Sequence, residues 1–245
     1  MINHHHNKLP LLHVASLPTN YNDEKNLIDS ISVYTNIDDE NKERFLRREE
    51  KYEKYYFQRI RNDLIEYSVG KRVVIVADEE QAIRYSRIIK EHTGGEIAAV
   101  VLTDSLKKDE EHDTDNAKLL SDLTNKVYIT NDEKDIEDII RQIKAELILG
   151  SSLEKHIAEK LAVPLVEISY PVYYKEIANH SAIGVRGIVN FIGEFISVIR
   201  EADASKKREL HEYVKAIRST RTEVVSLIHT DKNTLKAKQL YRNEV

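Results

Sequence analysis

Short, unbroken apolar runs alternate along this chain with longer stretches of helical spacing, and this alternation limits the possible folds more than any other feature. Val73–Ala77 is the clearest run, because it is rich in β-branched residues and has no polar position, which is typical of a strand covered on both faces of a parallel sheet. We expect the same burial for three further runs: Ile97–Leu102, Leu147–Leu149 and Leu165–Ser169. Val127–Thr130 predicts a shorter strand.

The stretches between these runs carry apolar residues at helical spacing, and each predicts a helix. They are Glu79–His92, Ala117–Thr124, Asp132–Ala145, Leu153–Leu161 and Ile188–Ile199, with a polar surface loop over Lys107–Asn116. Strands that alternate with helices in this way predict βαβ units. The expected fold class is therefore α/β, a doubly wound, Rossmann-like parallel sheet of four to five strands.

The two ends of the chain have different patterns. Asp38–Tyr67 contains no Gly or Pro and predicts one long amphipathic helix, whereas residues 9–36 mix apolar pieces with Pro and Asn and predict an extended segment with turns. After Arg200 we expect a charged helix at about 205–228 and a polar tail. The predicted organisation is an N-terminal segment over 1–36, which resembles the tail of a preceding domain, a Rossmann-like domain over 37–200, and a charged helical extension with a tail over 201–245.

Charge and hydropathy exclude several classes of partner. The formal net charge of -5 and the isoelectric point near 6.1 provide no basic surface for nucleic acid. No apolar run approaches the roughly 20 residues needed to cross a bilayer, and Met1–Pro10 lacks the apolar core of a signal peptide. We therefore expect a cytoplasmic protein that binds neither nucleic acid nor membrane.

The complete absence of cysteine excludes a cysteine nucleophile, disulfides and thiolate-bound clusters. It also fits a reducing compartment. His4–His6 form a short histidine tract, which is more typical of a solvated tail than of a metal site. We therefore expect no metal site in this chain and no cluster bound by the chain alone.

Candidate ligand-binding residues follow the predicted strands, because ligands of such sheets bind outside the carboxyl ends of the strands. Asp78 follows the first strand, Gly150, Ser151 and Ser152 follow the fourth, and Ser169-Tyr170-Pro171 follows the fifth. Gly150 would let backbone approach a ligand, and the N–H groups after Ser151 or Ser152 could hold an anion. The alternative is that either serine only caps the next helix.

Dinucleotide binding is disfavoured, because the turn after the first strand reads Asp78-Glu79-Glu80 instead of a glycine-rich fingerprint, and its acidic side chains would repel a pyrophosphate. No P-loop, zincin, nucleophile-elbow or EF-hand motif is present. His180 and Gly184 lie in the loop before the helix at Ile188–Ile199 and form a second candidate ligand segment. The alternative for His180 is an ordinary surface hydrogen bonder.

Several segments together are similar to the last domain of the nitrogenase component-one family of oxidoreductases. The most specific block runs from Ala145-Glu146-Leu147-Ile148-Leu149-Gly150-Ser151-Ser152 through His156-Ile157-Ala158 to Val163-Pro164-Leu165-Val166-Glu167-Ile168 and Pro171-Val172. Weaker matches are Gly70-Lys71-Arg72-Val73 with Asp78, the loop and helix over His180–Phe195, and the helix over Arg44–Tyr67. The resemblance spans about Leu9 to Arg200.

This resemblance implies a Rossmann-like fold and a role beside iron–sulfur clusters, or a metallocluster or tetrapyrrole, held together with partner chains. It implies a homologous component-one subunit or a second copy as partner, and an ATP-dependent iron–sulfur reductase that is reached through partner chains. Family members are roughly twice this length, and their cysteines lie in a first domain that has no counterpart here. In nitrogenase α subunits a histidine in the loop matching His180 ligates the metallocluster, whereas β-type subunits, which this chain resembles more, do not use that loop as a ligand.

Three functional hypotheses follow. The chain is a subunit or split piece of a nitrogenase-like reductase that forms one wall of a substrate or cofactor cleft, a non-catalytic assembly or scaffold protein, or a small-molecule-binding Rossmann module. Independently, the aromatic cluster of Tyr52, Tyr55, Tyr56 and Phe57 predicts association with itself or a homologous chain, because exposed aromatic side chains favour interfaces.

Overall fold

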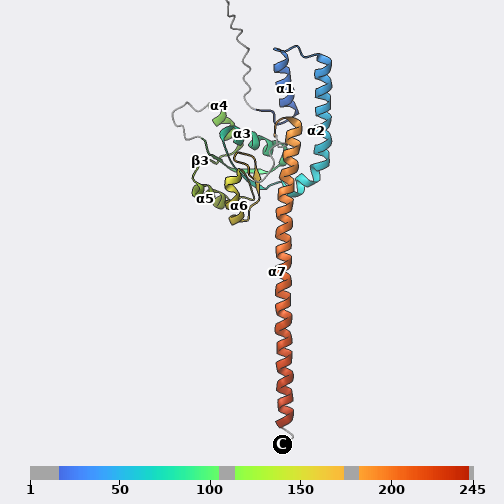
Figure 1. Cartoon of the computed structure of the whole chain (residues 1–245), viewed down its shortest axis with the longest axis vertical. Coiled ribbons are helices and arrows are strands. Elements are labelled where there is room, and N and C mark those ends of the chain that lie inside the picture. The colour runs from blue at the N-terminus through green and yellow to red at the C-terminus, as the bar shows by residue number, and fades with distance from the viewer. Residues whose placement is uncertain (1–16, 105–113, 174–181, 243–245) are drawn as a thin grey trace, which may run out of the picture. The chain divides into compact units, whose positions relative to one another are not determined.

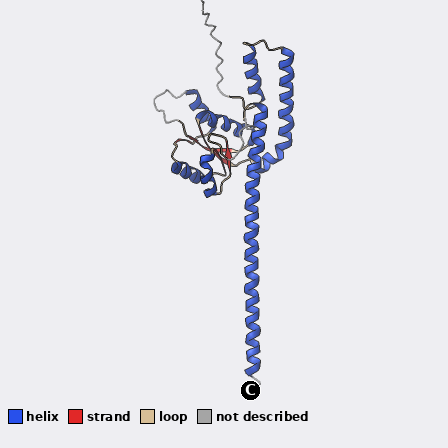
Figure 2. Ribbon diagram, viewed as in Figure 1, coloured by secondary structure: helices blue, strands red, loops and turns tan. Residues whose placement is uncertain are grey.

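The computed structural model describes residues 17–104, 114–173 and 182–242, with the backbone alone at 114–117 and 214–242. It divides into two compact units, Met1–Arg200 and Glu201–Val245. All strands among the described residues lie in the first unit, and the described part of the second unit belongs to one long helix. Figures 1 and 2 show the strands surrounded by the helices of the first unit.

Five parallel strands form one sheet in the order β3-β2-β1-β4-β5. The strands are β1 (Arg72–Ala77), β2 (Glu96–Leu102), β3 (Val127–Ile129), β4 (Leu147–Gly150) and β5 (Leu165–Glu167). The parallel α/β architecture predicted from the sequence is thus confirmed. From β1 the chain first adds β2 and β3 on one side and then β4 and β5 on the other side. The order of the strands therefore reverses between β1 and β4, although all five strands are parallel.

Burial of the strands follows their place in the sheet. The apolar residues of β1, β2 and β4 are all at most 9% exposed, as expected for strands with helices on both faces. In β5, Val166 and Glu167 are buried while Leu165 is half-buried. The edge strand β3 is exposed along its whole length. The burial predicted for the central strands is confirmed, and that of the fifth strand is partial.

Helices cover the two faces of the sheet with separate apolar clusters. On one face, α3 (Glu79–Ile88), α4 (Thr114–Leu123) and the start of α7 (Gly184–Arg242) pack over β1 and β2. On the other face lie α5 (Glu133–Ile143) and α6 (Lys155–Leu161), which carry Ile136, Ile140, Ile157 and Ala158. Short turns complete these helices: a π-helical turn η1 (Ile89–Thr93) after α3 and a 3-10 turn η2 (Ser152–Glu154) before α6.

The N-terminal region differs from the expected extended segment. Tyr21–Ser32 forms helix α1, which pairs with the long helix α2 (Asp39–Tyr67) as Figure 1 shows. The prediction was wrong because Asn20, which resembles a turn residue, is the N-cap of α1: its side chain accepts a hydrogen bond from Asp23 N at 2.9 Å. The Pro residue at position 18 precedes this cap and does not interrupt the helix.

The C-terminal region also differs from expectation. One helix, α7, begins at Gly184 and continues to Arg242. It includes the predicted helix Ile188–Ile199, the charged helix at about 205–228 and the described part of the polar tail. No Gly or Pro lies between Arg200 and Arg242, so nothing in the backbone stops the helix. None of the described helices combines the length and the hydropathy required to span a membrane.

Candidate functional site

Two of the predicted segments lie at the same edge of the sheet, at the point where the strand order reverses between β1 and β4. Ile75 pairs with Leu149, so Asp78 after β1 and Gly150 at the end of β4 emerge at neighbouring carboxyl ends. In open α/β sheets this crevice is where ligands bind. We therefore take the carboxyl edge around these residues as the candidate site.

Asp78 is the N-cap of α3, and its side chain accepts a hydrogen bond from Gln81 N at 2.8 Å. This cap satisfies one of the free N–H groups of the first helical turn. The N–H of Glu79, the first residue of α3, donates to the side chain of Asp104 at 3.4 Å. The first turn of α3 is therefore ordered by two carboxylates of the chain, one from its own N-cap and one from the segment after β2.

The segment predicted to cradle an anion already holds a carboxylate of the chain. Ser151 donates from its N–H and its hydroxyl to the same oxygen of Glu154, at 2.6 and 2.7 Å, and forms a capping box with it. A Cβ on Gly150 would lie 2.8 Å from that oxygen, so only glycine fits here without displacing Glu154. The hydroxyl of Ser152 donates to the buried Glu167 and accepts from Tyr173 N at 2.7 Å.

Gly184 lies in a different polar cluster, at the start of α7. It has a φ of +66° and its N–H donates to Pro18 O at 3.3 Å. The next N–H, that of Val185, donates to the carboxylate of Glu24 at 3.0 Å. Burial raises the pKa of Glu24, and this hydrogen bond only partly opposes the effect. His180, the remaining predicted site residue, lies outside the described residues.

Helix α3 adds polar groups that the sequence analysis missed. The side-chain oxygen Oε1 of Gln81 and the Nε of Arg84 are buried without a hydrogen-bond partner among the described residues. The guanidinium of Arg84 lies 5.2 Å from the centre of the Tyr85 ring. Burial raises the pKa of the Tyr85 hydroxyl, and the charge and hydrogen bond of the neighbouring Arg84 only partly oppose the effect.

Gln81 and Arg84 are one helical turn apart and follow the N-cap Asp78, so they share the part of α3 nearest the carboxyl edge. A buried donor and a buried acceptor without partners are costly, about 1–3 kcal/mol each. Such groups need an explanation in a folded protein, and a bound ligand or partner group is one. No spacing in the sequence marks these two atoms as unpartnered, because their burial depends on tertiary packing.

The residues present do not fit an iron–sulfur cluster. Clusters are held mainly by cysteine thiolates, and the chain has no cysteine. In the described parts of the chain, no group of three or more His, Asp and Glu residues is arranged to hold a metal ion. The polar atoms of α3 without a partner among the described residues include the amide oxygen of Gln81 and the Nε of Arg84, which suit hydrogen bonding to a ligand instead.

Comparison with known proteins gives a family match. The family model described as Nitrogenase component 1 type Oxidoreductase matches residues 12–200. A subunit of the light-independent protochlorophyllide reductase of Methylocella silvestris is 33% identical over 116 residues, which are 47% of this chain and 22% of the relative. The corresponding subunit from Prochlorococcus marinus (strain MIT 9301) is 33% identical over 111 residues, 45% of this chain and 20% of the relative.

Among solved structures, one described as nitrogenase Cp1 at pH 6.5 matches with a TM-score of 0.49 and 20% identity, covering 60% of this chain and 33% of that chain. The chain matches only about a fifth of the length of the two curated relatives above.

Proposed function

The chain belongs to the nitrogenase component 1 type oxidoreductase family, and on this premise we propose that it is a subunit or split piece of a nitrogenase-like reductase complex. In this proposal the carboxyl edge around Asp78, Gly150 and α3 forms one wall of a substrate or cofactor cleft. Partner chains supply the cysteines and hold the clusters, and the partner is a homologous component-one chain.

The observation that carries this proposal is the pair of buried, unpartnered polar atoms on Gln81 and Arg84. They lie on the helix that follows β1, beside the point where the strand order reverses. A wall completed by a second chain or a ligand would satisfy both atoms. The absence of cysteine is consistent with this division of work, because redox chemistry at clusters would then belong to the partner.

A non-catalytic assembly or scaffold protein is the second candidate. It is favoured by the internal carboxylates: Glu154 takes the donors of Ser151, and Glu24 takes the N–H at the start of α7. The chain's own groups thus occupy two places where a small ligand could otherwise bind.

Anaerobic purification of the tagged full chain from its native host tests the first proposal. We expect it to co-purify with a cysteine-bearing component-one chain and with iron. The Arg84→Gln variant should lower the reductase activity of this complex at least tenfold while leaving its composition unchanged. Arg141→Gln is the matched control, because Arg141 lies on α5, on the opposite face of the sheet, where it pairs with Glu137.

The outcomes separate the two candidates. If the complex contains the partner and iron but Arg84→Gln does not lower its reductase activity, the cleft role is contradicted and the scaffold proposal is favoured. Isolation of the full chain without any component-one partner would contradict the reductase proposal itself.

A further inference from the structure

A pocket of about 520 Å³, largely open to solvent, lies at the opposite edge of the sheet from the candidate site, between the second half of α2 and the π-helical turn η1. Val69 and Gly94, which line it, lie three and two residues before β1 and β2 begin. Ligand pockets of proteins usually measure about 300–1,000 Å³. The size is therefore that of a small-molecule site.

The walls of this pocket are mainly apolar. Phe57 and Leu64 form its base, and the Phe57 ring stacks on His92 with 4.9 Å between the ring centres. Ile65 and Val69 remain 59% and 60% exposed at its rim. A ligand with a hydrocarbon body would remove this apolar surface from water, which is favourable at roughly 25 cal/mol per Å².

The polar atoms of η1 beside the pocket are bound within the chain. The His92 ring nitrogen Nε2 lies 2.6 Å from Thr19 O, so it donates to this carbonyl. The hydroxyl of Thr93 donates to Ile89 O at 2.8 Å, and its carbonyl accepts from Ser68 at 2.7 Å. These groups make the wall rigid and leave little hydrogen-bonding capacity for a neutral polar ligand.

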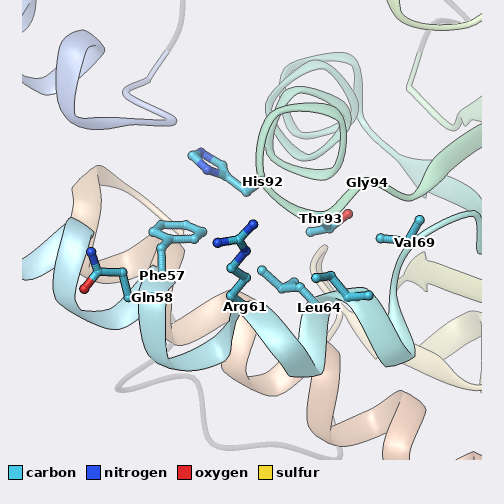
Figure 3. A pocket seen from close by; sticks show the side chains of 9 residues that line it. Phe57, Gln58, Arg61, Leu64, Val69, His92, Thr93 and Gly94 are labelled. Carbon is cyan, nitrogen blue, oxygen red and sulfur yellow. The ribbon is translucent and has the colours of Figure 1, made fainter.

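Arg61 is the exception. Figure 3 shows its guanidinium directed from α2 toward the turn that carries His92 and Thr93. In the described part of the chain it has no ion pair and no hydrogen bond, whereas Arg59, two residues earlier, donates to Tyr55 at 2.8 Å. The pocket therefore combines apolar walls with one available cation.

The turn η1 itself is unusual. It continues α3 with π-helical hydrogen bonding over Ile89–Thr93, and π-turns are rare and frequently occur at functional sites. Here the turn carries two lining residues, His92 and Thr93, and contributes the wall opposite α2. A rare π-helical turn thus forms part of the pocket wall.

We propose that this pocket is a binding site for a small apolar carboxylate, such as a medium-chain fatty acid. The hydrocarbon body lies against Phe57, Leu64, Ile65 and Val69, and the carboxylate pairs with the guanidinium of Arg61, whose planar fork matches a carboxylate in two parallel hydrogen bonds. The site lies on the opposite edge of the sheet from the proposed cleft and does not depend on the proposed function.

Calorimetric titration of the full chain with sodium decanoate, below its micellar concentration, tests the proposal. We expect saturable binding of one decanoate per chain. Arg61→Gln should weaken it about tenfold or more, as loss of a hydrogen-bonded charge does, and Arg61→Lys should retain part of the affinity. Arg59→Gln removes the same charge from the same helix but outside the pocket, and should leave binding unchanged.

Two further measurements make the test specific. The methyl resonances of Ile65 and Val69 should shift when decanoate is added. Decyltrimethylammonium has an alkyl tail of the same length and the opposite charge, so Arg61→Gln should not change its binding. Equal affinities for the wild type and Arg61→Gln, or no saturable binding, would overturn the proposal. Shifts of Ile65 and Val69 that follow protein concentration without decanoate would overturn it in favour of a second copy of the chain.

Discussion

Arg186 on α7 holds the carboxylate of Glu49 on α2 with two hydrogen bonds, from Nε at 2.8 Å and from Nη2 at 3.1 Å. Glu49 is 1% exposed. Burial alone would raise its pKa, but the hydrogen bonds from Arg186 and Arg48 outweigh burial and keep the pKa below its ordinary value. The pair fixes the long N-terminal helix to the first turn of α7.

Arg186→Leu should therefore destabilise the protein. We expect a loss of about 2 kcal/mol in the free energy of unfolding, less than for a fully enclosed pair because the Arg186 side chain is half exposed and Arg48 remains. The stabilisation in the wild type should be lost as the pH falls below 4.5 through the lowered pKa of Glu49. Urea unfolding at several pH values measures both effects.

The control for this variant is Arg200→Leu, on the same helix. Arg200 pairs with Asp63 at 2.8 Å, but both side chains are more than 40% exposed. An exposed pair contributes little to stability because solvent screens it, so Arg200→Leu should cost less than Arg186→Leu. Equal losses for the two variants would contradict the role assigned to the burial of Glu49.

Glu24 should have the opposite pH dependence. Its folded-state pKa is raised by burial, so the folded protein binds more protons than the unfolded chain between the ordinary value of 4.5 and the raised pKa. Stability should fall as the pH rises through this window. Glu24→Gln, whose amide oxygen still accepts from Val185 N, should abolish that fall, which comparison of melting temperatures from pH 4 to pH 8 would show.

Gly150 and Gly193 provide a matched pair of substitutions. Gly150→Ala should cost about 1–3 kcal/mol, because its Cβ would lie 2.8 Å from Glu154. Gly193→Ala should instead stabilise by about 0.5–1 kcal/mol, because it lies within α7 with nothing within 4 Å of the added Cβ. Thermal unfolding of both variants decides this, and a similar sign for the two would refute the close contact at Gly150.

Self-association through α2 remains a prediction. Tyr52 and Tyr56 have ring centres 4.3 Å apart, and Tyr55 meets Tyr56 edge to face at 5.1 Å, leaving Tyr55 52% and Tyr56 36% exposed. Phe57 does not belong to this surface, because it stacks on His92. The double variant Tyr55→Ser, Tyr56→Ser should weaken association at least tenfold in sedimentation experiments at about tens of micromolar.

Tyr34→Ser is the control for this association, because Tyr34 is 54% exposed and lies outside the cluster. A monomeric wild type at this concentration would contradict the prediction, and so would equal weakening by the control.

The sheet was predictable because its signal is local. A run such as Val73–Ala77 needs burial on both faces whatever surrounds it, and the structure places it at the centre of the sheet. Asn20 was misread because the same short amide side chain serves both turns and helix caps. The continuity of α7 could have been predicted from the absence of Gly and Pro after Arg200.

The arrangement of the candidate residues was predictable in part, whereas their role in ligand binding remains a prediction. The carboxyl-end rule placed Asp78 and Gly150 correctly at one edge. The motif Ser151-x-x-Glu154 is a readable capping box, and it indicates that the serine's donors serve the chain itself. The unpartnered atoms of Gln81 and Arg84 follow from tertiary packing, which helical spacing alone does not reveal.

The sheet ends on both sides in strands of three residues, β3 and β5, whereas the central β1 and β2 have six and seven. An outermost strand presents unpaired N–H and C=O groups on which another chain could build, and short outer strands are one way in which proteins limit such growth. The apolar β3 is exposed, but its three residues offer few backbone hydrogen bonds to another chain. The short outer strands thus limit the pairing of this sheet with a strand of another molecule.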